Sequence, residues 1–555
     1  MSNWQALTNQ PNFNASTMLL LTDGTVMCQE SGGKNWWRLT PDGMGDYANG
    51  SWSPLAAMKN TRLYYASAVM RDGRVFVAGG EYSDGGSDVD AAEIYDPIMN
   101  NWTSIATPAG WTNIGDAPCC VLPDGRILLG SINQKATAIY DPQAGTWSAS
   151  ANKDDISSEE TWTLLPDGTV LTAECAGHPK AEKYVTSQSK WVSASSTPVD
   201  LVQASSIEIG PAILMPDGKV FAIGATGHTA IYTPPNVADQ PGSWKQGPDF
   251  PKDANGKLME AKDAPACLMP NGRVLCVAGP AGEGGSYPGP MSFFEFDGSA
   301  LNPVAAPSSS GGPPFVGRML LLPSGQVLFA VGGNQMHVYT STGQPQAAWR
   351  PHITSCPTHL HDGLVYQLHG RQLNGLSQAN SYGDDASMAT NYPLVKLTTA
   401  GGKVHFCRTF DHSTMAVATG SNIESTYFAV PFGTPIGKAH LTVIANGIES
   451  APVVVTVERF QFRIPINEAM VNILIGSLAD GPLWVLTRNG PVPVDPWGPD
   501  LAAQAQKVRT QIAQGVRELE KLGVQLEAQL GNIKAIPASA PVASGQRRRL
   551  RREAA

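Results

Sequence analysis

The most constraining feature of this sequence is a tight turn that recurs seven times in its first 340 residues. Each turn lies between two apolar runs; five read Asp-Gly, and the others read Asn271-Gly272 and Ser324-Gly325. Asp-Gly and Asn-Gly favour β-hairpins because both central residues tolerate positive φ. The turn glycines lie 43 to 54 residues apart, a period typical of four-stranded propeller blades. Seven turns therefore predict a seven-bladed β-propeller.

Each repeat also carries aromatic residues at matching places. Four repeats have a Tyr followed by a Trp: Tyr95 with Trp102, Tyr140 with Trp147, Tyr184 with Trp191, and Tyr232 with Trp244. The sixth repeat departs from this pattern, with Phe296 and then Leu301. Gly79-Gly80 and Gly332-Gly333 stand where kelch repeats carry a glycine pair. The repeats therefore resemble the kelch type of propeller.

The N-terminus indicates how the ring closes. Residues Trp4 to Leu7 resemble the outermost strand of a blade, yet they precede the first hairpin. We expect them to complete the seventh blade, because pairing the two ends of the ring removes an open strand edge. The propeller would then span residues 1–350. An extended β-solenoid is the alternative, and it leaves Trp4 unexplained.

Residues 351–458 read as short strands separated by Gly, Asn and Pro turns. Runs such as Val453 to Val457 are β-branched and fit a β-sandwich. The stretches 372–378, 382–385 and 391–395 resemble the immunoglobulin-like "early set" domain that follows the propeller in the galactose oxidase family. The resemblance covers about residues 1–458 and implies an all-β fold for this part.

The remaining residues change character twice. Residues 459–500 are rich in Pro and Gly and predict an irregular arm. Apolar residues from Val508 to Ile533 then recur every three or four positions, which predicts an amphipathic α-helix over residues 501–534. This helix either folds back on the protein or self-associates as a coiled coil. Residues 535–555 predict a flexible basic tail that ends in an Arg-rich run.

Composition narrows the classes of partner. A formal net charge of −9 argues against nucleic-acid binding by the body of the protein, and only the Arg-rich tail suits RNA, a membrane surface or an acidic protein. No apolar run is long enough to span a membrane. No secretory signal is seen, so we expect a cytoplasmic chain with free thiols; export by another route would make it extracellular.

The resemblance to galactose oxidase and glyoxal oxidase also implies a copper–radical site built from two tyrosines, two histidines and a cross-linked cysteine. Tyr64 matches the radical tyrosine, and Tyr82 matches the aromatic residue that stacks over the cross-link. Ala15 stands at the cysteine position, and Phe315-Val316 stand at the tyrosine–histidine pair. His412 is the weak counterpart of the second histidine. Because Phe and Val bind no copper and Ala forms no thioether, we expect no copper and no other resident cofactor.

Acidic residues take up the same position in other repeats. The residues nine positions before the turn glycines are Ala15, Tyr64, Asp116, Glu159, Ile209, Asp263 and Val316. This position should lie where the innermost strand of each blade begins, at the mouth of the propeller. The carboxylates would repel one another unless a cation, a proton or an amine lies between them. The pattern predicts a mouth that binds polyols or a hard cation such as calcium.

Two other interpretations of these carboxylates stay open. Each carboxylate could instead accept backbone N–H bonds at a strand entrance. Glu159 with Asp116 or Asp263 could also form an acid/base pair for glycoside chemistry. The ligand-binding candidates are Tyr64, Tyr82, Asp116, Glu159, Asp263 and Arg318.

A second group of metal-binding residue types lies near the end of the predicted propeller. It comprises Cys356, His359, His361 and His369, and His359 and His361 would share a face if they lie on a strand. Thiolate and imidazole suit zinc or copper, but the spacing matches no closed site. Histidines without a metal are the simpler interpretation.

These observations support three functional hypotheses. The first is a non-catalytic recognition protein that binds a carbohydrate or a protein partner at the propeller mouth. The second is a galactose oxidase-like, metal-dependent oxidoreductase acting on sugar alcohols or aldehydes through Tyr64 and His412. In the third, the body is a rigid spacer and the last 55 residues carry the function. The fold alone does not choose among them.

Overall fold

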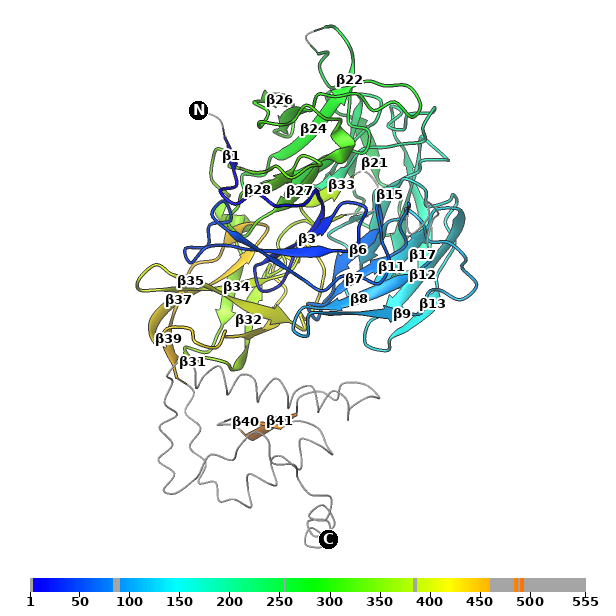
Figure 1. Ribbon diagram of the computed structural model, residues 1–555. Helices are drawn as coiled ribbons and strands as arrows, with labels where there is room; N and C mark the ends of the chain where they lie inside the picture. Colours follow the sequence, from blue (N-terminus) through cyan, green and yellow to red (C-terminus); the bar gives the residue numbers. More distant parts are fainter. Residues whose placement is uncertain are drawn as a thin grey trace, which may run out of the picture. The chain divides into compact units, whose positions relative to one another are not determined.

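A computed structural model of the protein describes residues 3–82, 90–253, 255–382 and 387–459, together with the backbone of two short strands at 484–487 and 490–493 (Figure 1). The chain divides into two units, residues 1–460 and 461–555. In the second unit, β40 (Trp484–Thr487) and β41 (Gly490–Pro493) pair antiparallel within the predicted irregular arm. The predicted helix over 501–534 and the tail over 535–555 lie outside the described residues.

Seven antiparallel sheets form the blades of a β-propeller, as the repeat predicted. The first two blades are β2 (Ala15–Leu20), β3 (Val26–Glu30), β4 (Trp36–Thr40), β5 (Ser51–Pro54), and β6 (Ala66–Val69), β7 (Val75–Ala78), β8 (Ala92–Asp96), β9 (Asn101–Ile105). The next two are β10 (Cys119–Val121), β11 (Ile127–Ser131), β12 (Gln134–Asp141), β13 (Thr146–Ala149), and β14 (Thr163–Leu164), β15 (Val170–Ala173), β16 (Lys180–Val185), β17 (Lys190–Ser196).

The remaining three blades follow the same plan. The fifth is β18 (Ala212–Leu214), β19 (Val220–Ile223), β20 (Thr229–Thr233) and β21 (Ser243–Gln246). The sixth is β23 (Pro265–Leu268), β24 (Val274–Pro280), β25 (Ser292–Phe296) and β26 (Leu301–Val304), with β22 (Met259–Glu260) beside β24. The seventh is β27 (Arg318–Leu321), β28 (Val327–Ala330), β29 (Met336–Tyr339) and β1 (Trp4–Ala6). The short 3-10 turns are η1 (Thr186–Gln188), η2 (Pro314–Val316) and η3 (Ala347–Trp349).

The N-terminal strand closes the ring. β1 pairs with β29, with Trp4 opposite Tyr339, and the Trp4 indole N–H donates to the carbonyl of Ala305 at 2.6 Å. The N-terminal strand therefore shares a blade with β27 to β29, about 300 residues later in the chain (Figure 1). This pairing confirms the closure predicted from Trp4.

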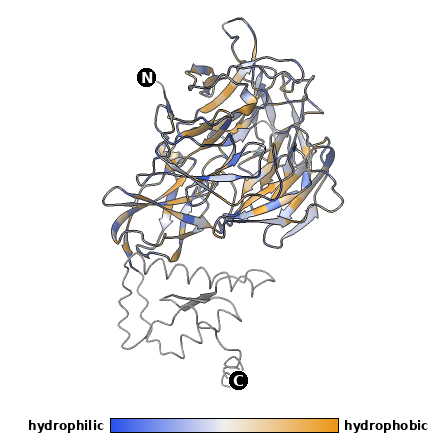
Figure 2. Ribbon diagram, in the orientation of Figure 1, coloured by the Kyte–Doolittle hydropathy of each residue, from blue (hydrophilic) through white to orange (hydrophobic). Residues whose placement is uncertain are grey.

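The first strand of each blade is innermost and buried, and the fourth is largely exposed. Hydrophobic residues accordingly follow the blade strands (Figure 2). The seven predicted turn glycines, Gly24, Gly73, Gly125, Gly168, Gly218, Gly272 and Gly325, all have φ between 76° and 91°. Glycine is the residue that takes this conformation without a steric cost. In the sixth blade Phe296 pairs with Leu301, where the other repeats place Tyr and Trp.

A nine-stranded sheet follows the propeller. Its strands are β30 (His352–Ser355), β31 (His359–His361), β32 (Val365–Arg371), β34 (Leu394–Thr399), β35 (Val404–Phe410), β36 (Glu424–Ala429), β37 (Gly437–Ala445), β38 (Ile448–Glu449) and β39 (Val453–Glu458). Leu368, Val395, Phe428, Leu441 and Val455 are among the buried residues of its own hydrophobic cluster. This sheet occupies the region predicted as the early set domain.

One segment of the sheet region enters the propeller. Residues 372–382 and 387–393, which we call the channel segment, include β33 (Asn380–Tyr382), and β33 pairs with β23, the innermost strand of blade six. The Gln378 side chain accepts a hydrogen bond from the Leu164 amide at 2.8 Å, and that of Asn380 accepts one from the Leu321 amide at 2.8 Å. Backbone groups on a buried strand edge need such partners. The segment therefore satisfies the inner edges of several blades.

None of the helices in the described residues has the length and apolar character of a transmembrane span.

The sheet region packs against the hairpin turns of the propeller, and some turn glycines are needed for this approach. A Cβ at Gly24 would lie 2.4 Å from the Phe406 ring, whereas a Cβ at Gly218 would meet nothing within 4 Å. The two glycines have nearly the same φ, +76° and +81°. They differ in packing rather than in backbone conformation.

We expect Gly24→Ala to destabilise the protein more than Gly218→Ala. Both variants carry the left-handed backbone cost of about 1–2 kcal/mol, but only Gly24→Ala adds an overpacking cost of about 1–3 kcal/mol against Phe406. Chemical denaturation of the two variants measures the difference. Equal losses of stability would show that the turn of blade one does not need close contact with Phe406.

Candidate functional site

The predicted mouth residues lie just before the innermost strands. Tyr64 precedes β6, Asp116 precedes β10, Glu159 precedes β14 and Asp263 precedes β23. Tyr64, Glu159 and Asp263 have φ values of 49°, 58° and 48°. This conformation is rare for residues other than glycine, and it is found at sites where the surrounding structure imposes it. Residues nine positions before a turn glycine therefore occupy equivalent places, just before the innermost strands of their blades.

Three carboxylates, those of Asp263, Glu208 and Glu159, act on one tyrosine, Tyr287. Asp116 and Asp263 are buried, with 3% and 9% of their surface exposed. The Tyr287 hydroxyl donates to Glu208 at 2.6 Å. Burial first, then the charges of Asp263, Glu208 and Glu159, raise the pKa of Tyr287 well above its ordinary value. These carboxylates from different blades therefore act on the same ring.

Tyr82 is a second mouth tyrosine on which nearby carboxylates act. Its ring is 63% exposed and packs edge-on against Tyr64, with 6.3 Å between the ring centroids. Glu81 is the largest cause of its raised pKa, followed by burial, and the charges of Asp116 and Glu159 add to the shift. The mouth therefore combines buried carboxylates with an exposed aromatic ring.

Tyr382 is the mouth residue that sequence reasoning missed. It belongs to the channel segment, yet its ring lies parallel to that of Tyr64, 6.3 Å between centroids and 3° between planes. Its hydroxyl donates to the carbonyl of Phe315 at 2.8 Å. Tyr382 is more than 300 residues from Tyr64 in sequence, and no motif around it signals this contact.

Arg318 lies against two tyrosine rings of the mouth. Its guanidinium lies 3.5 Å from the Tyr382 ring centroid and 5.7 Å from that of Tyr64. It also donates to the carbonyls of Phe315 and Gly317 at 2.7 and 2.8 Å. Arginine stacks well on aromatic rings. Arg318 is only 3% exposed, so it contacts the tyrosine rings from the protein interior and helps to position them.

Lys262 is the second cation near the mouth. Its ammonium donates to Gln203 and to the carbonyls of Gly282 and Gly284, and it lies 4.3 Å from the centroid of the Tyr287 ring. These contacts fix the segment that carries Tyr287. The Lys262 ammonium also lies 3.8 Å from the carboxylate of Glu260.

His412 lies at a different place from Tyr64. It is buried beneath the propeller, where its backbone N–H donates to the carbonyl of Arg71, and Tyr64 lies at the opposite end of β6. Its Nδ1 is 2.9 Å from the Thr426 hydroxyl, and its ring stacks on Tyr392. Four residues of β6 separate the two sites, about 13 Å of extended chain. The structure therefore does not bring Tyr64 and His412 together.

The other nine histidines also lie elsewhere. His178 and His228 pair with Asp200 and Asp249, and His337 contacts Ser308. The remaining six, His352, His359, His361, His369, His405 and His440, belong to strands of the nine-stranded sheet. Phe315 and Val316 form part of η2, and Ala15 begins β2. Tyr64 is thus the one predicted copper-site residue that the structure places beside Tyr82.

The Cys356 group forms a different arrangement from a metal centre. His359 and His361 both lie on β31, and both approach the carboxylate of Glu458, at 2.8 and 3.4 Å. Cys356 packs against the hydrophobic cluster of the sheet instead, and His369 lies on β32. Among the described residues, no three His, Cys, Asp or Glu side chains converge in a way that would hold a metal ion.

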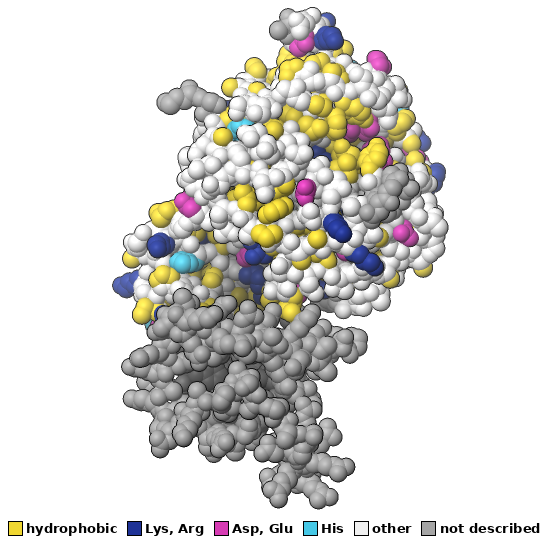
Figure 3. Space-filling model, viewed as in Figure 1, with side chains coloured by type: hydrophobic (Ala, Val, Ile, Leu, Met, Phe, Trp, Pro, Cys, Tyr) yellow, Lys and Arg dark blue, Asp and Glu magenta, His cyan; other side chains and the backbone are white. Residues whose placement is uncertain are grey.

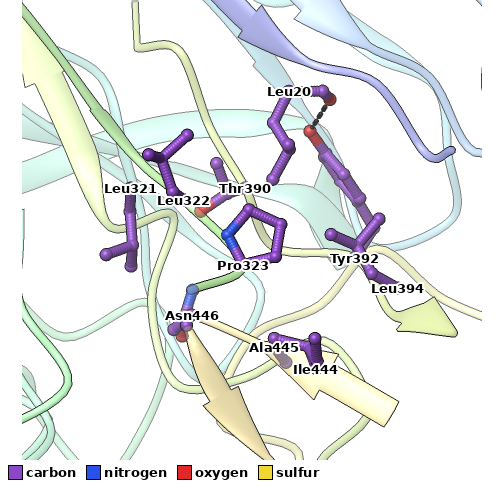
Figure 4. A pocket seen from close by; sticks show the side chains of 11 residues that line it. Leu20, Leu321, Leu322, Pro323, Thr390, Tyr392, Leu394, Ile444, Ala445 and Asn446 are labelled. Atoms are coloured by element: carbon purple, nitrogen blue, oxygen red, sulfur yellow. Dashed lines mark hydrogen bonds between the residues drawn. The ribbon is translucent and has the colours of Figure 1, made fainter. Parts of the chain in front are cut away.

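Two small cavities lie within the part of the protein that the structure describes. A cavity between the propeller and the nine-stranded sheet has about 10 Å³ of free volume, and Leu20, Pro323, Tyr392 and Ile444 are among the residues that line it (Figure 4). A cavity between blades four and five is of similar size. Such a volume holds about one water molecule.

The surface seen in Figure 3 mixes residue types. Acidic side chains lie among hydrophobic ones, and lysines and arginines are scattered over this face.

Comparisons with known proteins identify the repeat. Residues 62–109, the second blade, match the kelch motif. Galactose oxidase of Gibberella zeae is 43% identical over 60 residues, 11% of this chain and 9% of that protein. An F-box/kelch-repeat protein of Arabidopsis thaliana is 35% identical over 107 residues, 18% of this chain and 28% of that protein. This chain therefore spans less than a third of either relative's length in these matches.

A fungal alcohol oxidase of the AA5 family in complex with copper aligns with 82% of this chain and 98% of its own, at 14% identity and a TM-score of 0.47.

Burial of His412 predicts a pH dependence of stability. Burial, and to a lesser extent the charge of Arg71, lowers the pKa of His412 from 6.5 to about 3. Between these values the unfolded chain binds a proton that the native protein does not, so stability falls as pH drops below 6.5. At pH 5 the loss should be about 2 kcal/mol.

Urea unfolding at pH 7.5 and pH 5 measures this loss. His412→Gln should reduce the difference between the two pH values, whereas the same change at the exposed His440 should leave it unaltered. An unchanged difference in His412→Gln would contradict the assignment.

Proposed function

We propose that this chain, a seven-bladed β-propeller whose second blade matches the kelch motif and which has a 60-residue stretch 43% identical to galactose oxidase, is a non-catalytic recognition protein whose propeller mouth binds a carbohydrate. The observation that carries the proposal is the exposed ring of Tyr82, which packs against Tyr64 and lies within the field of the Asp116 and Glu159 carboxylates. Carboxylates accept hydrogen bonds from sugar hydroxyls, and an aromatic ring offers an apolar face.

The charged residues of the mouth indicate which kind of sugar it would bind. The charges of Glu159, Glu208 and Asp263 act on Tyr287, and the two nearby cations, Arg318 and Lys262, are engaged by carbonyls and tyrosine rings. A sugar that carries a primary ammonium group would neutralise part of the excess negative charge. A hard cation such as Ca²⁺ would compete for the same carboxylates. Buried acceptors favour a small ligand over a flat protein surface, so we place a protein partner second.

A glycan array tests the proposal. The full-length protein is applied to immobilised galactosyl and glucosaminyl oligosaccharides, beside the variant Asp116→Asn/Glu159→Gln/Asp263→Asn, which keeps side-chain size and removes the charges. We expect the unmodified protein to be retained, glucosaminyl chains more strongly, and the variant to lose at least tenfold in affinity, about 1.4 kcal/mol.

One further condition sharpens the array result. CaCl₂ in place of EDTA should weaken retention on glucosaminyl chains. Absence of retention on every sugar, or equal retention of the variant, would refute carbohydrate binding at the mouth. Retention of a protein instead, lost in the variant, would assign the mouth to a protein partner.

The second candidate function is a galactose oxidase-like oxidoreductase. Tyr64 and the similarity to galactose oxidase favour it. The residues around Tyr64 do not fit copper, because Cu²⁺ prefers imidazole ligands and the ten histidines have the other locations described above. The guanidinium of Arg318 also lies over Tyr64 and Tyr382, where it would repel a second cation.

Metal analysis separates the two candidates. Protein purified after incubation with Cu²⁺ should contain no stoichiometric copper and should release no hydrogen peroxide from galactose or aldehydes. Stoichiometric copper with peroxide release that depends on Tyr64 would overturn the recognition role.

A further inference from the structure

We propose that Tyr382 is a positioning residue of the mouth, and that the channel segment couples ligand binding there to docking of the nine-stranded sheet. The ligand part of this inference rests on the proposed function. The coupling part rests on the contacts of the channel segment alone.

Tyr382 is fixed on three sides. Its hydroxyl donates to the Phe315 carbonyl, its ring lies against the Arg318 guanidinium, and the Tyr64 ring is parallel to it. With only 1% of its surface exposed, it acts through Tyr64 and Arg318 rather than by touching a ligand. Loss of its ring would free both of these neighbours.

The channel segment is anchored along its length. Below Tyr382, the Asn380 side chain accepts from the Leu321 amide of blade seven, and the Ala379 carbonyl accepts from the Leu268 amide of blade six. Further along, Gln378 accepts from the Leu164 amide of blade four. Tyr382 therefore moves only if these bonds also shift.

The base of the segment belongs to the sheet region. The Glu424 carboxylate, on β36, accepts from the Leu373 amide. The Asn446 side chain, after β37, accepts from the amides of Leu376 and Ser377 at 2.8 and 3.2 Å. A displacement of the sheet would therefore act on the base of the same segment that carries Tyr382. Linkage is reciprocal, so a ligand that prefers the ordered mouth strengthens docking by the same factor.

Hydrogen exchange tests the coupling without any ligand. The amides of Gly80 and Glu81 donate to the carbonyls of Gly115 and Leu63, which adjoin mouth residues. In the full-length protein, Tyr382→Ala should raise their exchange rates about tenfold. The Met215 amide, which donates to Lys219 in blade five, should change little and serves as the internal reference.

Four further variants make the result specific. Tyr382→Phe keeps the ring and should return the Gly80 and Glu81 rates close to those of the unmodified protein. Gln378→Ala changes a remote anchor and should also raise them. Tyr427→Ala removes a tyrosine of β36 that stacks on Phe410 and should not. Tyr382→Leu replaces Tyr382→Ala if the latter does not fold.

The two proposals fail in different ways. Unchanged Gly80 and Glu81 rates in Tyr382→Ala and Gln378→Ala overturn the coupling, whatever the array shows. If these rates rise, a glucosamine trisaccharide should bind Gln378→Ala more weakly than the unmodified protein; equal affinity would overturn the link between docking and binding. Raised rates with no binding of the trisaccharide or of galactobiose by the unmodified protein would leave the coupling intact and count against carbohydrate recognition.

Discussion

The inner strand of every blade has an edge that faces the central channel, and much of this structure depends on how those edges are satisfied. Backbone N–H and C=O groups that are buried without a partner cost free energy comparable to a lost hydrogen bond. Here the channel segment supplies partners: β33 continues the sheet of blade six, and the side chains of Gln378 and Asn380 serve blades four and seven. The Tyr392 hydroxyl donates to the Leu20 carbonyl of blade one.

This solution ties the mouth to the region that follows the propeller. The channel segment carries Tyr382, which lies beside Tyr64 and Arg318. The mouth is therefore assembled from the starts of several inner strands and from one residue of the channel segment. The sheet region packs against the hairpin turns at the other end of these inner strands, as at Gly24 and Phe406.

The electrostatics of the mouth follow from the same arrangement. Carboxylates that precede different inner strands lie at the same end of the propeller, and Tyr287 and Tyr82 lie within their field. Arg318 and Lys262 are engaged by carbonyls and rings, so their charges are held in fixed positions. A site of this kind suits the proposed recognition of a polyol or an amine.

The sequence by itself determined the features that repeat. The period of the turn glycines predicted seven blades, Trp4 predicted the closure of the ring, and the offset from each glycine located Tyr64, Asp116, Glu159 and Asp263 at the strand starts. These predictions succeed because hairpin chemistry and strand alternation are local. Only the tertiary structure decided that Tyr382 lies against Tyr64, that Arg318 is turned inward, and that His412 lies under the propeller. Those contacts join residues far apart in the chain, and they arise from the need to pair buried strand edges, which leaves no periodic signal in the sequence.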